Sequence, residues 1–179
     1  MNILSSAHII KYEFVSFNKE DISILKNRRN AKLRYIISTY IALLSLLGMG
    51  LVIGYMNAYA GLAGFDIVLI NRVAPVFFSF LTILLTYFFY KFYRQVVHPL
   101  NKDLKSGSKQ LIWFNTKKYA MPFFNRYYLY IPLTTRPQVE IGKEDFFMLP
   151  EDACMTLETG KNSEYILRIN FNDTKIDFY

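Results

Sequence analysis

The chain has 179 residues, of which 53% are hydrophobic and 17% aromatic, and its formal net charge is +7. Its single cysteine, Cys154, excludes an internal disulfide, and together with His8 and His98 it gives no spacing typical of metal ligands. Length alone would suggest one domain, but two long uncharged segments occupy about a third of it. This composition predicts a membrane protein with a modest soluble part.

The N-terminal segment, residues 1–32, begins with an alternating pattern. In Ile9 to Phe17, one parity carries Ile10, Tyr12, Phe14 and Ser16 and the other carries Lys11, Glu13 and Val15, and this alternation favours a short strand. Asn18 is suited to cap a helical turn that starts at Lys19. One interpretation is a surface helix on the bilayer that uses the apolar residues before Lys26. The favoured interpretation is a strand added to the C-terminal domain, followed by a linker.

Two uncharged runs are long enough to cross a bilayer as helices. Tyr35 to Phe65 and Val73 to Tyr90 contain no Asp, Glu, Lys or Arg, and a hydrocarbon core of roughly 30 Å needs about 20 apolar helical residues. We expect transmembrane helices at residues 33–57, ending near Met56, and 73–95, with Pro75 in the first turn. The intervening loop, residues 58–72, would be extracytoplasmic. No signal-peptide pattern precedes the first run.

The distribution of basic residues predicts the orientation. Seven basic and three acidic residues precede the first run, five basic and one acidic lie just beyond the second run in residues 91–109, and the loop carries only Asp66 and Arg72. Lys and Arg stay on the cytoplasmic side, so we expect both termini in the cytoplasm and the hairpin in the cytoplasmic (inner) membrane. The cations expected at the lipid headgroups are Arg28, Arg29, Lys32, Arg34, Lys91 and Arg94.

The first run contains a small-residue pattern typical of close helix packing. Gly50 and Gly54 form G-x-x-x-G, and Gly48 precedes them. The contacting helix could be the Phe-rich second run of the same chain or a helix of another chain. No ionisable residue lies in the middle of either run, which argues against a proton relay, a transporter site or an ion-selective channel.

A linker is predicted at residues 96–108, because His98-Pro99 interrupts the helical pattern and a polar stretch ends at Gly107. From residue 109 to 179 the period changes to two. The predicted strands are Gln110–Tyr119, Arg126–Leu133, Val139–Ile141, Ala153–Thr159, Tyr165–Phe171 and the tail Thr174–Tyr179, with one helical turn at Lys143–Met148. We expect a membrane α + β chain whose cytoplasmic domain is a small antiparallel SH3/OB-like meander or partial β barrel.

Catalytic motifs are absent from the sequence: it has no Gly-rich phosphate loop, G-x-S-x-G or H-E-x-x-H. We therefore predict no catalytic residue, no cofactor and no metal. Aromatic and basic residues that could contact a partner or ligand are Trp113, Arg126, Tyr128 and Tyr130. Nucleic acid is disfavoured as a partner, because the last seventy residues carry eight basic and nine acidic side chains and attract phosphate weakly.

Three segments carry a resemblance to known proteins. Asp103–Lys109, the strand Arg126–Ile131, and Lys143–Phe146 followed by Ser163–Ile169 resemble a small uncharacterised β domain found behind two membrane helices in bacterial proteins of the Bacteroidetes type. The resemblance covers roughly the last eighty residues. It implies a β-rich fold and no known activity. The arrangement is also similar to NfeD-like proteins, which place an OB-type domain after membrane helices, although no specific motif matches.

Two functions fit these observations. The first is a non-catalytic accessory or scaffolding subunit that binds other membrane-protein subunits through its hairpin and its β domain. The alternative is a ligand-gated, membrane-disrupting effector that self-associates through the glycine pattern of the hairpin. The sequence itself favours the accessory subunit, because the seventy residues available are few for the barrels of such effectors.

Overall fold

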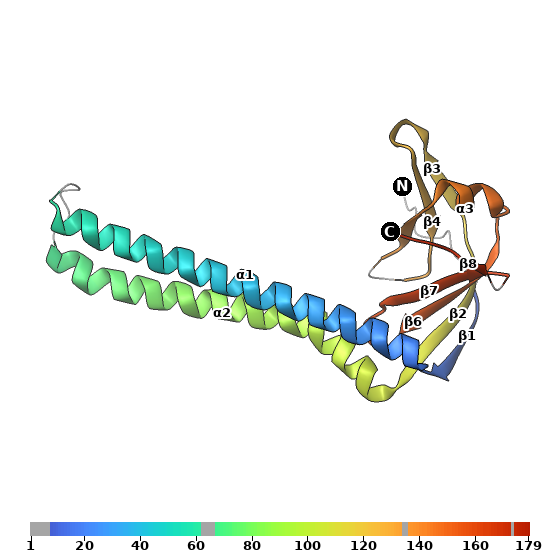
Figure 1. Ribbon diagram of the computed structural model, residues 1–179, viewed down its shortest axis with the longest axis horizontal. Helices are drawn as coiled ribbons and strands as arrows, with labels where there is room; N and C mark the ends of the chain where they lie inside the picture. Colours follow the sequence, from blue (N-terminus) through green and yellow to red (C-terminus); the bar gives the residue numbers. More distant parts are fainter. Residues whose placement is uncertain (1–7, 62–66, 134–135, 173) are drawn as a thin grey trace. The chain divides into compact units, whose positions relative to one another are not determined.

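The computed structural model describes residues 8–61, 67–133, 136–172 and 174–179 (Figure 1). The chain divides into two compact units. The β unit comprises Met1–Lys26 and Pro99–Tyr179, and the helical hairpin comprises Asn27–His98. The β unit is therefore assembled from segments on both flanks of the hairpin, which are far apart in the sequence.

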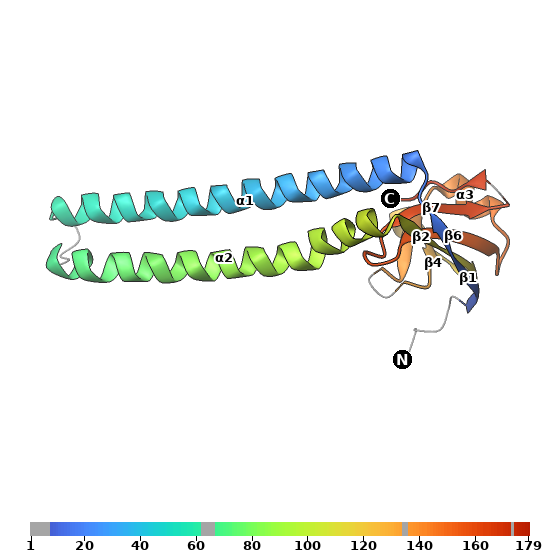
Figure 2. The same ribbon diagram turned by 90° about the horizontal axis from the view of Figure 1, so that it is seen from below.

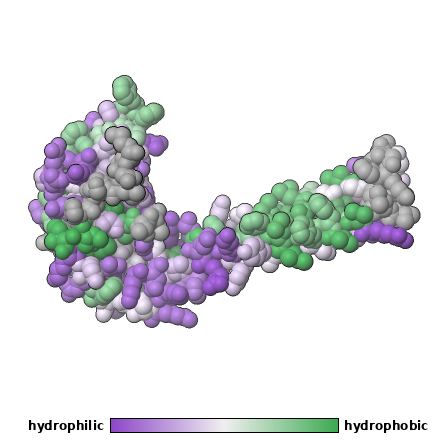
Figure 3. Space-filling view, turned by 180° about the vertical axis from the view of Figure 1, so that it is seen from behind, coloured by the Kyte–Doolittle hydropathy of each residue, from purple (hydrophilic) through white to green (hydrophobic). Residues whose placement is uncertain are grey.

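Two long helices, α1 (Lys19–Tyr59) and α2 (Ile67–Ser106), dominate the hairpin. They run beside each other in opposite directions (Figures 1 and 2). Both are long and apolar enough to cross a membrane, and only 6% and 0% of their most apolar windows are buried. Helices in the core of a soluble protein would be buried, so this exposure favours contact with lipid. Hydrophobic residues cover the middle of the hairpin (Figure 3).

The predicted linker before the first helix is wrong, because α1 begins at Lys19. Asn18 and Asp21 form a reciprocal cap at this end: the Asp21 N–H donates to Asn18 Oδ1 at 2.7 Å, and the Asn18 N–H donates to Asp21 Oδ2 at 3.0 Å. Such a capping box satisfies free N–H groups of the first turn. No proline or glycine follows before Gly48, so the helix continues.

The predicted linker at residues 96–108 is also helical, because α2 continues past Pro99 to Ser106. A proline inside a helix costs about 3 kcal/mol. Burial of the turns after it offsets that cost, since Leu100 is 4% exposed and packs with Leu25 and Leu167. Pro75 likewise lies beyond the first turn, because α2 begins at Ile67. The predicted loop residue Asp66 lies outside the described residues.

In the described part of the chain, eight strands form two antiparallel sheets. The five-stranded sheet has the order β1-β2-β6-β7-β8, and the three-stranded sheet is a β3-β4-β5 meander joined by a short 3₁₀ turn, η1. A single-turn helix, α3, follows β5. The bounds are β1 His8–Ser16, β2 Ser108–Asn115, β3 Lys118–Met121, η1 Pro122–Phe124, β4 Arg126–Tyr130, β5 Gln138–Ile141, α3 Lys143–Met148, β6 Cys154–Gly160, β7 Ile166–Phe171 and β8 Thr174–Lys175.

The predicted partial barrel is not found, because the described strands form two separate open sheets. The division occurs at Thr116, inside the strand predicted for Gln110–Tyr119. Its N–H donates to Ala153 O at 3.1 Å, and its hydroxyl donates to Tyr130 O at 2.5 Å. These bonds turn the chain out of the first sheet and into the second. At the tail, Phe178 forms an isolated bridge with Ile141 of β5.

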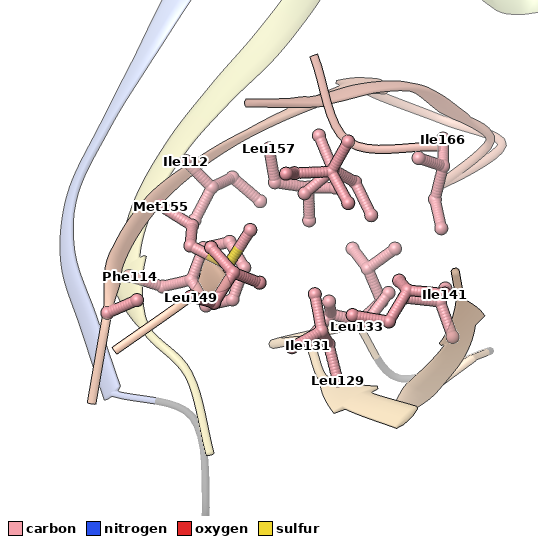
Figure 4. Packing of buried hydrophobic residues seen from close by; sticks show 14 of the residues in the cluster. Ile112, Phe114, Leu129, Ile131, Leu133, Ile141, Leu149, Met155, Leu157 and Ile166 are labelled. Carbon is pink, nitrogen blue, oxygen red and sulfur yellow. The ribbon is translucent and has the colours of Figure 1, made fainter. Parts of the chain in front are cut away.

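The main core lies between the inner faces of the two sheets (Figure 4). Alternate residues of β2 and β6 point toward it, such as Phe114 and Leu157, and Leu129 of β4 faces them; all three are 0% exposed. This alternation is typical of antiparallel sheets with one covered face. All residues of this core belong to the β unit, so its two sheets pack together without using the apolar side chains of the hairpin.

Asp103, in the last turns of α2, fixes the turn between β6 and β7. This fully buried carboxylate accepts the N–H and side-chain amide of Asn162, both at 2.7 Å, and the N–H and hydroxyl of Ser163 at 2.9 and 2.5 Å. Hydrogen bonds to a charged acceptor are about twice as strong as neutral ones. Gly160 lies against this carboxylate, and a Cβ there would be 2.3 Å from Asp103 Oδ2.

We expect Gly160→Ala to lower the free energy of unfolding of the β unit by about 1–3 kcal/mol, because the new methyl group collides with Asp103 and Ser163. Gly142→Ala is the matched control, since its Cβ would meet only Asp145 Oδ2, at an ordinary 3.5 Å. Denaturant unfolding in detergent, followed by the fluorescence of Trp113, the single tryptophan, measures both. Equal stability of the two variants would contradict the role of Asp103.

Candidate functional site

Four charged side chains meet on the outer face of the five-stranded sheet; we call Asp21, Lys109, Glu158 and Arg168 the charge cluster. Lys109 Nζ lies 2.9 Å from Asp21 Oδ2 and 2.6 Å from Glu158 Oε2. Arg168 lies 3.4 Å from Asp21 Oδ1 and 3.5 Å from Glu158 Oε2. The first turn of α1 supplies Asp21, and strands β2, β6 and β7 supply the others.

The charge cluster is buried and electrically balanced. The side chain of Asp21 is 0% exposed and that of Lys109 is 8% exposed. Burial alone would lower the pKa of Lys109, but its hydrogen bonds to Glu158 and Asp21 outweigh burial and hold the pKa above its ordinary value of 10.5. Arg168 also reaches the exposed Glu20 at 2.5 Å. Each carboxylate is paired with a cation, so the cluster joins the first turn of α1 to the sheet; Asp21 Oδ1 has the ion pair with Arg168 but no hydrogen-bond partner.

The predicted helix-packing glycines face open space. A Cβ at Gly48, Gly50 or Gly54 would meet no atom within 4 Å. Gly50 and Gly54 instead line a groove of about 480 Å³ with Phe77 and Phe78 of α2. The second helix therefore does not pack closely over the glycines. Elsewhere the two helices do contact each other: the hydroxyls of Tyr40 and Thr86 lie 2.9 Å apart, and the ring centroids of Tyr40 and Phe89 lie 5.1 Å apart.

The six cations predicted at the membrane interface lie on the helices next to their apolar parts. Arg29 donates to Asn30 Oδ1 at 3.1 and 2.8 Å. Arg28, Arg34, Lys91 and Arg94 are exposed, whereas Arg29 and Lys32 are half-buried. These positions leave the charged groups accessible to solvent or headgroups.

The four predicted contact residues are divided between the two sheets. Trp113 is half-buried on β2, with Lys11 Nζ 5.1 Å from its ring centroid. Arg126, Tyr128 and Tyr130 alternate on the outer face of β4. A hydrogen bond from Arg126 to Tyr128 and the nearby Glu140 raise the pKa of the Arg126 guanidinium. Trp113 therefore does not share a surface strand with the other three.

A highly exposed apolar group lies between the predicted strands Gln110–Tyr119 and Arg126–Leu133; we call Met121, Phe123 and Phe124 the aromatic tip. Phe123 is 99% exposed and Phe124 is 72% exposed. The tip protrudes at the end of β3 and β4, where Figure 3 shows hydrophobic surface. Two adjacent Phe residues in a Pro-initiated turn were the signal that could have identified it, because a short turn cannot bury both rings.

Exposed apolar residues of α3 lie near the tip. Phe147 and Met148 are 66% and 65% exposed. Tyr127 connects the two groups: its hydroxyl donates to Asn125 Oδ1 at 3.2 Å, and its ring centroid lies 5.8 Å from that of Phe147. The buried Tyr127 therefore contacts both Asn125, at the end of the turn that carries the tip, and Phe147 of α3.

A polar-lined hollow of about 490 Å³ lies beside α3, between Lys117, Phe147 and Asp152. The hollow also contains Lys118, whose ammonium group is hydrogen-bonded to backbone carbonyl groups. Its Nζ donates to Phe146 O at 3.0 Å and to Leu149 O at 2.6 Å. Among the residues that the structure describes, no group of three or more His, Cys, Asp or Glu side chains could hold a metal ion.

No family model, curated protein or solved structure matches the chain. The chain is therefore classified by its own architecture. Two long apolar helices are combined with a β unit of two open antiparallel sheets.

We expect Lys109→Met to lower the free energy of unfolding by about 3 kcal/mol at pH 7, because it leaves Asp21 and Glu158 buried with one cation fewer. Lys175→Met, which removes an exposed pair with Asp177, should cost less than about 0.5 kcal/mol. Denaturant unfolding by circular dichroism measures both variants.

Comparing the wild-type chain with Lys109→Met also gives a prediction for the pH dependence of stability. The pKa of Lys109 is higher in the folded chain than its ordinary value of 10.5. Its stabilisation is therefore complete below pH 10.5 and is lost as the pH rises through the folded pKa. The difference between wild type and Lys109→Met should stay constant from pH 7 to 10 and shrink above that range. A difference that shrank already at pH 8 would contradict the pairing.

Proposed function

We propose that this chain is a non-catalytic accessory or scaffolding subunit of a larger complex in the cytoplasmic (inner) membrane. Its hairpin crosses the bilayer, its termini face the cytoplasm, and its β unit binds a protein partner. The resemblance to two-helix membrane proteins of the Bacteroidetes type belongs to the same proposal. It agrees with an arrangement of paired apolar helices and a C-terminal β region.

The pairing of β1 with β2 supports the proposed topology. These strands lie on opposite flanks of the hairpin, and residues from His8↔Asn115 to Ser16↔Ser108 face each other in an antiparallel ladder. Strand pairing requires both flanks on the same side of a membrane, so the hairpin must cross it an even number of times. The basic flanks then favour the cytoplasm as that side.

The observation that carries the function is the aromatic tip. The β unit already buries a complete core between its sheets, so the exposed rings of Phe123 and Phe124 contribute little to its folding. Exposed aromatic side chains that fill a partner's pocket commonly supply most of the binding energy of an interface. We therefore infer that the tip is a contact site for a partner.

A protein partner fits the tip better than an anionic lipid surface. The first turn of the neighbouring α3 carries Glu144 and Asp145, and the hollow beside it includes Glu151 and Asp152. These carboxylates would be repelled by anionic headgroups. The last seventy residues as a whole carry no excess of positive charge.

The test is extraction of the tagged full chain in mild detergent at native expression level, then native-size separation and mass spectrometry. We expect a discrete assembly with other membrane subunits. Phe123→Ser with Phe124→Ser should reduce recovery of the partner at least tenfold, roughly the loss of one binding hot spot. Phe123→Leu, which keeps an apolar tip, should retain it.

The tip variants should leave the unfolding midpoint unchanged, because both rings are exposed. Recovery of the wild-type chain without any other membrane subunit, as a monomer or as copies of itself alone, would contradict the accessory function. Recovery of the same partner with the double serine variant would exclude the tip as its binding site.

The open groove beside Gly50 and Gly54 favours a second candidate, an effector that disrupts membranes after its hairpins self-associate. Because a Cβ at either glycine meets nothing within 4 Å, Gly50→Ile and Gly54→Ile should leave the hairpin folded. A loss of self-association and of toxicity in these variants would support the effector. Loss of co-purifying membrane subunits would support the accessory function, and Gly48→Ile, outside the groove, is the control.

A further inference from the structure

Strand β1 forms one edge of the five-stranded sheet. The order of the sheet places β2 on one side of it, and none of the described strands lies on the other (Figure 1). At nine residues, β1 is the longest strand of the unit. A long edge strand presents a row of free N–H and C=O groups that another strand can pair with.

The side chains of β1 are exposed on both faces of this edge. Tyr12 and Phe14, opposite Ile112 and Gln110 of β2, extend the inner face and are 61% and 49% exposed. Lys11 and Glu13 alternate with them on the outer face and lie 3.4 Å apart, with their side chains 65% and 53% exposed. The edge therefore combines an apolar row with a pair of opposite charges.

We propose that β1 pairs with β1 of a second copy of this chain, antiparallel, with the two-fold axis at Tyr12. In this register Tyr12 lies opposite its own counterpart. Lys11 of each copy lies opposite Glu13 of the other, which gives two cross-strand ion pairs on one face. The aromatic side chains gather on the opposite face. The two five-stranded sheets join into one continuous sheet.

Charge complementarity selects this register and this partner. A shift by two residues in either direction places Lys11 opposite Lys11 or Glu13 opposite Glu13, and like charges directly opposite destabilise a sheet. A shift by one residue places apolar side chains on the charged face. A sequence that complements its own reverse is what a two-fold, isologous interface requires.

The bulge between Ile9 and Lys11 limits the length of the contact. Regular pairing with β2 runs from Lys11 to Ser16, so the two-fold axis at Tyr12 lies inside the regular part of the strand. The interface is short, and we expect a reversible dimer rather than an obligate one.

The test uses cysteine cross-linking of the purified full chain reconstituted in phosphatidylcholine liposomes. The exposed Cys154 is the only cysteine and is replaced by Ser. Tyr12→Cys in this background places two sulfurs across the axis, where opposite Cα atoms of a strand pair are roughly 4.5–5.5 Å apart. That spacing suits a disulfide. We expect a rapid disulfide dimer under mild oxidation.

Lys175→Cys on β8, the exposed opposite edge of the same sheet, is the matched control and should stay monomeric. Adding Lys11→Glu or Glu13→Lys to Tyr12→Cys should slow cross-linking about tenfold, because each creates like charges across the axis. The double change Lys11→Glu with Glu13→Lys should restore the original rate. Circular dichroism and the unfolding midpoint confirm that each variant is folded.

Equal cross-linking at Tyr12→Cys and Lys175→Cys would show random collision and overturn the proposal. So would single charge variants that cross-link at the wild-type rate, or a double variant that is not rescued. These outcomes leave the proposed accessory function untouched, because its readout depends on Phe123 and Phe124. Loss of the partner from the tip variants, conversely, should not change cross-linking through β1.

Discussion

The fold depends on the burial of Asp21. This carboxylate is 0% exposed, and a buried charge is tolerated only when cations and hydrogen-bond donors surround it. Its cations, Lys109 and Arg168, lie on β2 and β7 of the other flank of the hairpin. The start of α1 and the sheet therefore stabilise each other. Neither flank can complete the β unit without the other, so the intervening hairpin has to bring its two ends together.

The groups that stabilise the molecule are distinct from those left for binding. The charge cluster, Asp103 and the core between the sheets are buried and paired. The aromatic tip, the free edge of β1 and the groove beside Gly50 and Gly54 are exposed and contribute little to these contacts. These exposed surfaces are therefore the parts of the described chain that remain available for contact with other molecules.

Local patterns identified most strands, because alternation depends only on neighbouring residues: β4, β5, β6 and β7 lie within a few residues of their predicted bounds. The predictions were wrong where the structure is determined by contacts between residues far apart in the sequence. Helix α2 continues past Pro99 because Leu100 is buried against Leu25, and the sheets stay open because Thr116 turns the chain toward Tyr130. Counting the charged residues in each segment could not predict the ion pair between Asp21 and Lys109, because the residues around each of them give no information about its partner.

The aromatic tip and the edge of β1 lie on different sheets, which decides whether both can bind at the same time. The aromatic tip belongs to the three-stranded sheet, whereas β1 is the outer strand of the five-stranded sheet. A contact through the aromatic tip therefore leaves the edge of β1 free to bind, and a contact through β1 leaves the tip free. Two copies joined at β1 would carry two tips, and binding of the second tip to a multimeric partner would become intramolecular. Weak contacts at a short strand edge and at a small aromatic turn could in this way give a stable assembly without a large interface at either place.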